Sequence, residues 1–261
     1  MGRTIVMIHG MFGGSWCWDG YRGFFAARGY TCLTPVLRHH DADPGGPPHP
    51  ALGTTSLLDY ADDLERQIRL LPEPPVLMGH SMGGLIAQIL AGRGVGSAAV
   101  LLSPAAPAGI LAVRLSVLKS IQGEFLRWGF WRRPVKSTFS STCYSSLHLL
   151  SREEQEAIYS RFVYESGRAA FEMGFGAFDP RNAARVDETR VGIPVLVLSG
   201  TEDRITPASV ARKVALKYRR TATYMAFPDH AHWIIGEPGW EAIAGHIDLW
   251  LNPAGPIPPG L

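Results

Sequence analysis

The sequence has few of the features that mark secreted, membrane-spanning or nucleic-acid-binding chains. Its three cysteines, Cys17, Cys32 and Cys143, are widely spaced and odd in number, which indicates neither a disulfide framework nor a zinc knuckle. No apolar run is long enough to span a membrane, and the first residues lack the pattern of a signal peptide. The net charge of +2 comes without a long basic block. We therefore expect a cytoplasmic protein with no nucleic-acid partner, and membrane contact is not expected.

Short apolar runs bounded by Gly or Pro alternate with helical patterns along the 261-residue chain. This alternation predicts an α/β fold with a mostly parallel sheet of about six strands and helices on both faces. The predicted strands are Thr4–His9, Thr31–Val36, Pro75–Gly79, Ala98–Ser103, Pro194–Ser199 and Thr223–Phe227. The predicted helices are Trp16–Ala27, Leu57–Leu70, Leu85–Ala91, Pro207–Lys217 and Trp240–Leu251, with Thr206 as the cap of the fourth.

Residues 104–193 interrupt this rhythm after the fourth predicted strand, because they are far more than a crossover connection needs. They contain helical patterns at Ala112–Gln122 and Ser151–Glu165, and many aromatic residues. The second pattern opens with a capping box that pairs Ser151 with Glu154. We interpret residues 104–193 as a helical cap over the strand ends, with residues 1–103 and 194–261 forming the core.

The run Gly79–Gly83 places a serine between glycines at the junction of a predicted strand and helix. In the pattern G-x-S-x-G, the serine occupies a strained turn whose flanking glycines allow the backbones to approach closely. We therefore expect Ser81 to be a nucleophile. His80 is expected to pack or form a hydrogen bond beneath the turn.

A nucleophilic serine needs a base, and the base needs an orienting acid. His230 and His232 both follow the last predicted strand and are both candidates for the base. Asp203 follows the preceding strand and is the candidate acid, with the adjacent Glu202 as its competitor. The other place for an acid, after Ala98–Ser103, contains no carboxylate, which favours Asp203.

Two backbone amides should stabilise the oxyanion that forms when the serine attacks a carbonyl. Met82 follows the nucleophile and supplies one of them. Met11, with Phe12 as the alternative, supplies the other from a glycine-rich loop after the first strand. We also expect apolar side chains to bind the substrate, namely Phe12, Trp128, Trp131 and Trp233.

These motifs resemble the α/β-hydrolase superfamily of serine hydrolases, over nearly the whole chain apart from the cap. The resemblance rests on His9-Gly10, the run Gly79–Gly84, the Gly-x-x-Asp that ends at Asp203, and Glu237-Pro238. In many members the catalytic histidine lies five residues before such a Glu-Pro element, which selects His232. The chain begins at what would be the family's third strand, which implies the α/β-hydrolase fold with a six-stranded sheet. The segment His9–Trp18, with aromatic Trp16 and Trp18, looks like the branch of small esterases and hydroxynitrile lyases.

The resemblance and the residues together imply a serine esterase that acts on a small-molecule carboxylic ester of small to medium size and fairly apolar character. Lactones, thioesters and amides use the same chemistry and remain open. Cofactor-free lyase or perhydrolase chemistry is the first alternative, and a non-catalytic ligand receptor is the second. No cofactor is implied. The adjacent histidines of Arg38–Asp43 precede a Pro/Gly-rich segment, Asp41–Gly53, that we expect to be a surface loop, so no metal site is expected.

Overall fold

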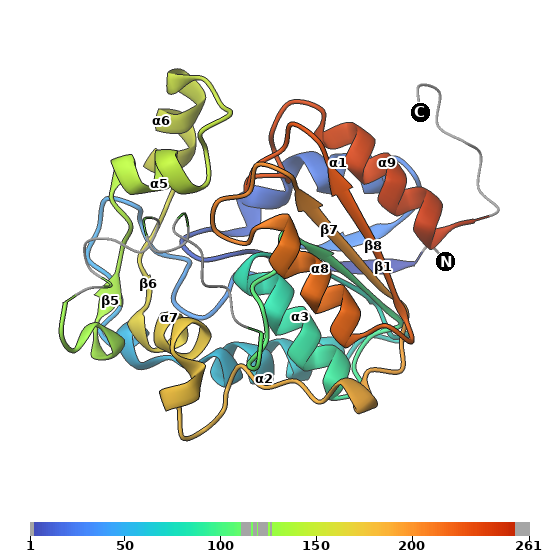
Figure 1. Cartoon of the computed structure of the whole chain (residues 1–261), viewed down its shortest axis with the longest axis horizontal. Helices are drawn as coiled ribbons and strands as arrows, with labels where there is room; N and C mark the ends of the chain where they lie inside the picture. Colours follow the sequence, from blue (N-terminus) through green and yellow to red (C-terminus); the bar gives the residue numbers. More distant parts are fainter. Residues whose placement is uncertain (1–2, 111–115, 117–118, 120–124, 126, 254–261) are drawn as a thin grey trace.

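A six-stranded parallel sheet forms the centre of the computed structural model, which describes residues 3–110, 116, 119, 125 and 127–253 (Figure 1). The strand order is β2-β1-β3-β4-β7-β8. All neighbouring pairs are parallel. The strands are β1 (Thr4–Ile8), β2 (Thr31–Leu33), β3 (Val76–His80), β4 (Ala98–Leu102), β7 (Val195–Gly200) and β8 (Ala222–Phe227). The predicted sheet of about six mostly parallel strands is therefore confirmed.

Helices cover both faces of the sheet, as predicted (Figure 1). On one face lie α1 (Asp19–Ala26) and α9 (Trp240–Leu251), and on the other α2 (Leu57–Ile68), α3 (Met82–Gly92) and α8 (Ala208–Lys217). Side chains alternate along the strands between two cores. Met7 and Met78 pack with α1 and α9, whereas Ile8 and Leu77 pack with α2, α3 and α8. The hydrophobic effect thus fixes the register of each strand between two apolar layers.

Three predicted elements of the core differ from the structure by more than two residues at one end. The predicted strand Thr31–Val36 ends at Leu33, and Pro35 two residues later has no N–H to donate to the sheet. The helix predicted at Trp16–Ala27 is divided into a 3₁₀ turn, η1 (Ser15–Trp18), and α1. The helix predicted to begin at Leu85 begins at Met82, because α3 starts directly after the turn that carries Ser81.

The insert, residues 104–193, contains short helices and a small two-stranded antiparallel sheet (Figure 1). The predicted helix Ala112–Gln122 lies almost wholly outside the described residues. The helix predicted at Ser151–Glu165 ends at Ser160, although its predicted capping box is present. The insert's elements are η4 (Phe130–Arg132), β5 (Pro134–Val135), α5 (Phe139–Ser145), α6 (Arg152–Ser160), β6 (Glu165–Ser166), α7 (Gly167–Gly174), η5 (Gly176–Phe178) and η6 (Glu188–Arg190).

The insert packs against the core at several places, which include the following two. Ala183, Ala184 and Val186 are buried in the same apolar layer as α3. The predicted surface loop Asp41–Gly53 ends in a buried turn, η2 (Leu52–Thr54), where a Cβ on Gly53 would lie 2.5 Å from the backbone of Arg133. The end of this loop is therefore not at the surface as expected. No helix among the described residues is long and apolar enough to cross a membrane.

Candidate active site

Ser81 lies on a strained turn between β3 and α3. Its φ of 54° is in the left-handed region, which residues other than glycine rarely adopt. The turn depends on the flanking glycines. A Cβ on Gly79 would lie 2.2 Å from the carbonyl oxygen of Gly83, and one on Gly83 would lie 2.1 Å from that of Ile8 in β1. The G-x-S-x-G pattern is thus required by the packing of the nucleophile turn against the sheet.

His232 and Asp203 extend from Ser81 in one hydrogen-bonded chain. The Ser81 Oγ lies 3.0 Å from Nε2 of His232, and Nδ1 of His232 lies 2.9 Å from Oδ2 of Asp203. A carboxylate only accepts, so Nδ1 carries the proton and Nε2 accepts the serine hydroxyl. His232 and Asp203 are almost fully buried, whereas Ser81 is partly exposed. The structure therefore brings together the three residues predicted for nucleophile, base and acid.

Backbone contacts between the loops after β7 and β8 bring Asp203 and His232 together. The Glu202 N–H donates to the carbonyl oxygen of His230 at 2.9 Å. A Cβ on Gly200 would lie 2.1 Å from that oxygen, so this approach requires glycine. Glu202 itself is exposed, and the acid that meets His232 is Asp203.

Asp203 is held as an anion by its neighbours. Its Oδ1 accepts the backbone N–H groups of Ile205 at 2.9 Å and Thr206 at 2.7 Å. Burial alone raises the pKa of Asp203, but His232 and the hydrogen bonds from Thr206 outweigh this effect and hold the pKa at about 2. The carboxylate is consequently ionised and can orient the imidazole and stabilise its protonated form.

Thr206 contributes a contact that sequence reasoning missed. The sequence predicts this residue as a helix cap, but its hydroxyl lies 2.8 Å from Oδ2 of Asp203 and 3.0 Å from the Ser103 carbonyl oxygen. The hydroxyl oxygen of Thr206 also lies 3.3 Å from Nδ1 of His232. The Asp203-x-x-Thr206 spacing, which closes a turn after a strand, was the available signal for this role.

His230, the other candidate base, is bound elsewhere. Its Nδ1 lies 3.2 Å from Oε2 of the buried Glu237, which also accepts the Ala231 N–H at 2.8 Å. Glu237 of the Glu-Pro element therefore holds the loop that carries His232. His230 belongs to this contact, and His232 lies against Ser81.

The two amides predicted for the oxyanion belong to peptide units whose carbonyl groups are held. In a trans peptide the N–H points away from the C=O of the same unit. The Ser81 carbonyl accepts N–H groups from Gly84, Leu85 and Ala105 at 2.9, 3.2 and 2.9 Å, which orients the Met82 N–H in the opposite direction.

On the other side of Ser81, His9 orients the peptide unit of Gly10 and Met11. Its Nε2 accepts the Leu37 N–H at 3.1 Å, so its proton is on Nδ1, which donates to the Gly10 carbonyl at 2.8 Å. The Met11 N–H points away from that bond. Phe12, the alternative donor, has a positive φ of 66°, which indicates strain in this loop.

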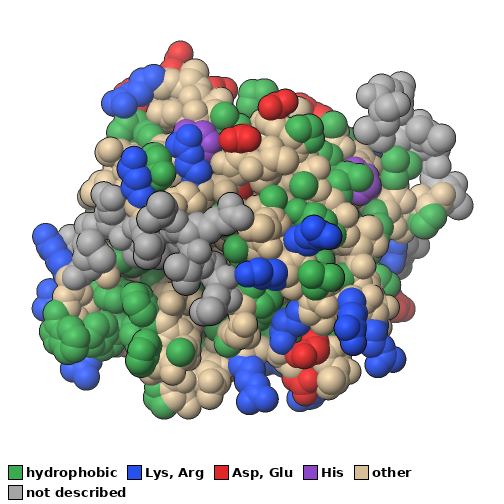
Figure 2. Space-filling view, in the orientation of Figure 1, with side chains coloured by type: hydrophobic (Ala, Val, Ile, Leu, Met, Phe, Trp, Pro, Cys, Tyr) green, Lys and Arg blue, Asp and Glu red, His purple; other side chains and the backbone are tan. Residues whose placement is uncertain are grey.

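The four aromatic residues predicted to bind substrate are in different settings. Phe12 packs on Phe162 at 6.0 Å between ring centroids, and Trp233 packs on the same ring at 6.1 Å. Trp131 and Met11 both pack against a small apolar cluster of the insert. Trp128 is 89% exposed, and this exposure gives no support to the prediction that it binds the substrate. Hydrophobic side chains gather on the surface of the insert near β5, at the left of the view (Figure 2).

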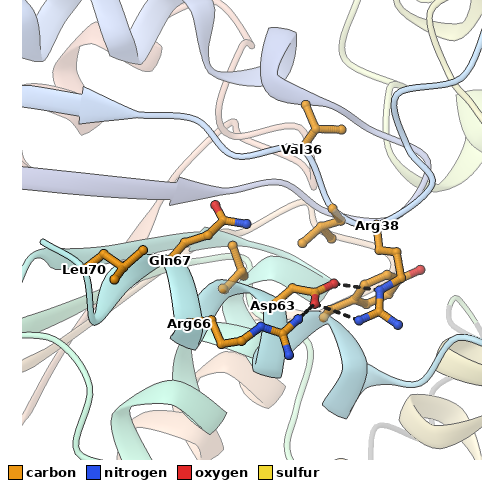
Figure 3. Close-up of a pocket in the computed structure, with 9 residues that line it drawn as sticks. Val36, Arg38, Asp63, Arg66, Gln67 and Leu70 are labelled. Atoms are coloured by element: carbon orange, nitrogen blue, oxygen red, sulfur yellow. Dashed lines mark hydrogen bonds and ion pairs between the residues drawn. The ribbon is translucent and has the colours of Figure 1, made fainter.

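A cavity of about 320 Å³ lies apart from these residues, between α2 and the segment that follows β2 (Figure 3). Arg38, in its lining, forms two hydrogen bonds of 2.7 Å to Asp63.

The two adjacent histidines of Arg38–Asp43, where no metal site was expected, have different partners. His39 stacks on His49, and His40 contacts Glu165. Among residues whose placement is described, no three His, Cys, Asp or Glu side chains are grouped as a metal site.

The chain belongs to the alpha/beta hydrolase family, whose sequence profile matches residues 5–244. No curated protein matches it in sequence. Similar solved structures include a pyrethroid hydrolase from Sphingobium faniae (TM-score 0.73, 20% identity, covering 97% of this chain and 99% of the other). A methylesterase from Arabidopsis is also similar (TM-score 0.71, 13% identity, covering 95% of this chain and 98% of the other). So is a monoacylglycerol lipase from Paleococcus ferrophilus (TM-score 0.67, 24% identity, covering 96% of each chain). At these identities the similarity defines the fold.

Proposed function

We propose that this protein hydrolyses a carboxylic ester of a small-to-medium, fairly apolar substrate through an acyl-enzyme on Ser81. The observation that carries the proposal is the hydrogen-bonded chain from the Ser81 hydroxyl through His232 to Asp203. Such a chain is what a neutral hydroxyl needs to attack a carbonyl. The methylesterase, the pyrethroid hydrolase and the lipase among the similar structures are consistent with it.

Each step of the reaction has a residue in reach. Ser81 Oγ attacks the ester carbonyl carbon while its proton passes to Nε2 of His232, and Asp203 stabilises the imidazolium. The resulting oxyanion accepts the N–H groups of Met82 and of Met11 or Phe12. When the C–O bond breaks, His232 returns the proton to the leaving alcohol. Water then attacks the acyl-serine with His232 again as base, which releases the acid.

The preference for apolar substrates is inferred from the aromatic side chains next to the proposed machinery. Phe12 follows one candidate oxyanion donor, and Trp233 follows the base. Both rings contact Phe162 of the insert, and Trp16 lies 5.8 Å from Trp233. We propose that the insert acts as a cap and that the acyl or alcohol group is recognised by burial against this aromatic surface.

Turnover of short-chain p-nitrophenyl esters by matched variants tests the proposal. Ser81→Ala should abolish turnover, and Asp203→Asn should lower kcat by about 10³- to 10⁴-fold. Glu202→Gln is the matched control, because the exposed Glu202 should change kcat by less than about twofold. Turnover that survives in Ser81→Ala would contradict the proposal. A wild-type enzyme that hydrolyses none of these esters would favour the lyase, perhydrolase or receptor alternatives.

A further inference from the structure

A carboxylate of the insert is buried beside the core loop that carries the proposed oxyanion donor. Glu165 of β6 and His40, which follows β2, are both fully buried, and Oε2 of Glu165 lies 3.0 Å from Nε2 of His40. The other carboxylate oxygen accepts the hydroxyl of Tyr60 at 2.7 Å and the N–H of Ser166 at 2.6 Å. A carboxylate with this many donors is stabilised as an anion.

The hydrogen bonds of His40 require both of its ring nitrogens to be protonated. Nε2 faces the Glu165 carboxylate, and Nδ1 lies 3.1 Å from the carbonyl oxygen of Arg38. Both partners only accept, so the ring donates twice and is an imidazolium. Burial lowers the pKa of His40, but the charge of Glu165 and the hydrogen bond to it outweigh burial and raise the pKa overall. Burial likewise raises the pKa of Glu165, yet His40 brings it below its usual value.

The charge on His40 acts on His9, whose ring lies 5.1 Å away. His9 must be neutral, because its Nε2 accepts an N–H from Leu37. Burial and, second, His40 lower the pKa of His9 to about 3. The remaining proton is on Nδ1, which holds the Gly10 carbonyl and so orients the Met11 N–H.

The same segment of the insert holds the loop at a second point. The Val163 N–H donates to the Phe12 carbonyl at 2.9 Å, and the ring of Phe162 packs on that of Phe12. Residues 162–166 therefore contact the oxyanion loop directly at Phe12 and indirectly through His40 and His9. The positive φ of Phe12 shows that the loop conformation is one that needs such support.

We propose that Glu165 is a positioning residue for ester hydrolysis, which fixes His40 and, through His9, the Gly10–Met11 peptide that receives the oxyanion. The inference rests on the proposed function. Among the described residues, the titratable groups that face His40 from other elements are His9, Tyr60 and Glu165. Because the carboxylate belongs to the insert, the oxyanion loop adopts its working geometry only when this part of the insert is docked.

Glu165→Gln tests the proposal against Glu172→Gln as a matched control. Glu172 is also a fully buried carboxylate of the insert, but it is bonded to Ser56, Leu57 and Arg168 and makes none of the contacts to His40 or His9 described here. Both variants should unfold at lower temperature than the wild type. Only Glu165→Gln should lower kcat, on the order of 10- to 100-fold, with KM changed less than about threefold. Both are assayed where circular dichroism shows them fully folded.

Equal kcat for wild type and folded Glu165→Gln overturns the inference, as does an equal loss of kcat in Glu172→Gln. Tyr60→Phe, which removes one hydrogen bond to Glu165 without removing a charge, should lower kcat by about threefold and serves if Glu165→Gln does not fold. These outcomes are distinct from failure of the proposed function, in which the wild type itself has no esterase turnover.

A readout without substrate comes from imidazole ¹⁵N NMR of the wild type at neutral to mildly alkaline pH. His40 should carry protons on both nitrogens, and His9 on Nδ1 alone. In Glu165→Gln, His40 should lose one proton. A neutral His40 in the wild type contradicts the inference whether or not the protein hydrolyses esters.

Discussion

His80 donates a hydrogen bond of 2.8 Å from Nε2 to the backbone carbonyl of His232. The residue before the proposed nucleophile thus supports the backbone of the proposed base, and their two rings lie 4.9 Å apart. Burial and, second, the nearby His232 lower the pKa of His80 to about 3, so the ring is neutral at physiological pH. This contact holds the end of β3 against the loop after β8.

His80 and His9 should make the protein sensitive to mild acid. Both have pKa values lowered from 6.5 to about 3 in the folded protein. Their contribution to stability is therefore fully present above pH 6.5 and is lost as the pH falls toward 3, because only the unfolded chain binds these protons. Each should contribute a slope approaching about 1.4 kcal/mol per pH unit. Denaturant unfolding between pH 7 and 5 measures this slope.

His80→Gln, which removes one of these two histidines, should lower the slope by the share of one group, about 1.4 kcal/mol per pH unit. A free energy of unfolding that is constant from pH 6.5 to 5 in the wild type would show that these histidines are not buried in the neutral form.

The Thr206 hydroxyl should assist turnover through Asp203. Thr206→Val keeps the shape of the side chain but removes the donor, and should lower kcat by about tenfold. Thr206→Ser keeps the donor and should stay within about twofold of wild type. Steady-state kinetics on one ester decides the matter, since equal rates for the two variants would assign Thr206 a packing role only.

The two histidines after β8 should differ sharply in their effect on activity. His232→Ala should lower kcat by at least about 10⁴-fold, because it removes the proposed base. His230→Ala removes the contact with Glu237 and should lower thermal stability while it keeps kcat within about tenfold of wild type. The reverse order of activities would assign the base to His230.

Gly83 should tolerate no side chain. A Cβ there would lie 2.1 Å from the carbonyl oxygen of Ile8, so Gly83→Ala must separate α3 from β1 and should cost about 3 kcal/mol or more. Gly23 on the exposed face of α1 is the matched control, because no atom lies within 4 Å of its added Cβ. Gly23→Ala should stabilise the protein by about 0.5–1 kcal/mol. Chemical denaturation of both variants compares these effects.

The parts of the fold that the sequence predicts are those with a local cause. The strands β3 and β4 are continuous apolar runs, and the glycines around Ser81 reveal a turn too tight for a Cβ. The two-residue strands β5 and β6 have no such pattern. The sequence predicts Glu165 at the end of a helix, whereas the structure has it in β6, bonded to His40, which is far away in the sequence.

In the candidate site, too, the sequence predicts what has a local cause and misses what depends on distant contacts. Ser81 and Asp203 follow predicted strands, and parallel strand ends meet at one edge of the sheet, so their proximity follows from the fold. The choice between His230 and His232 required a family resemblance, because both lie on one loop. The roles of Thr206 and His80 depend on hydrogen bonds that the periodicity of the sequence does not predict.

Reaction with a fluorophosphonate probe, followed by peptide mass spectrometry, tests the central claim most directly. The reagent forms a stable adduct with a serine whose hydroxyl is activated by a neighbouring base. We expect one adduct, on the peptide that contains Ser81, with none in Ser81→Ala and a much slower reaction in His232→Ala. An adduct on another residue, or no adduct in a protein that still hydrolyses esters, would contradict the assignment of Ser81 as the nucleophile.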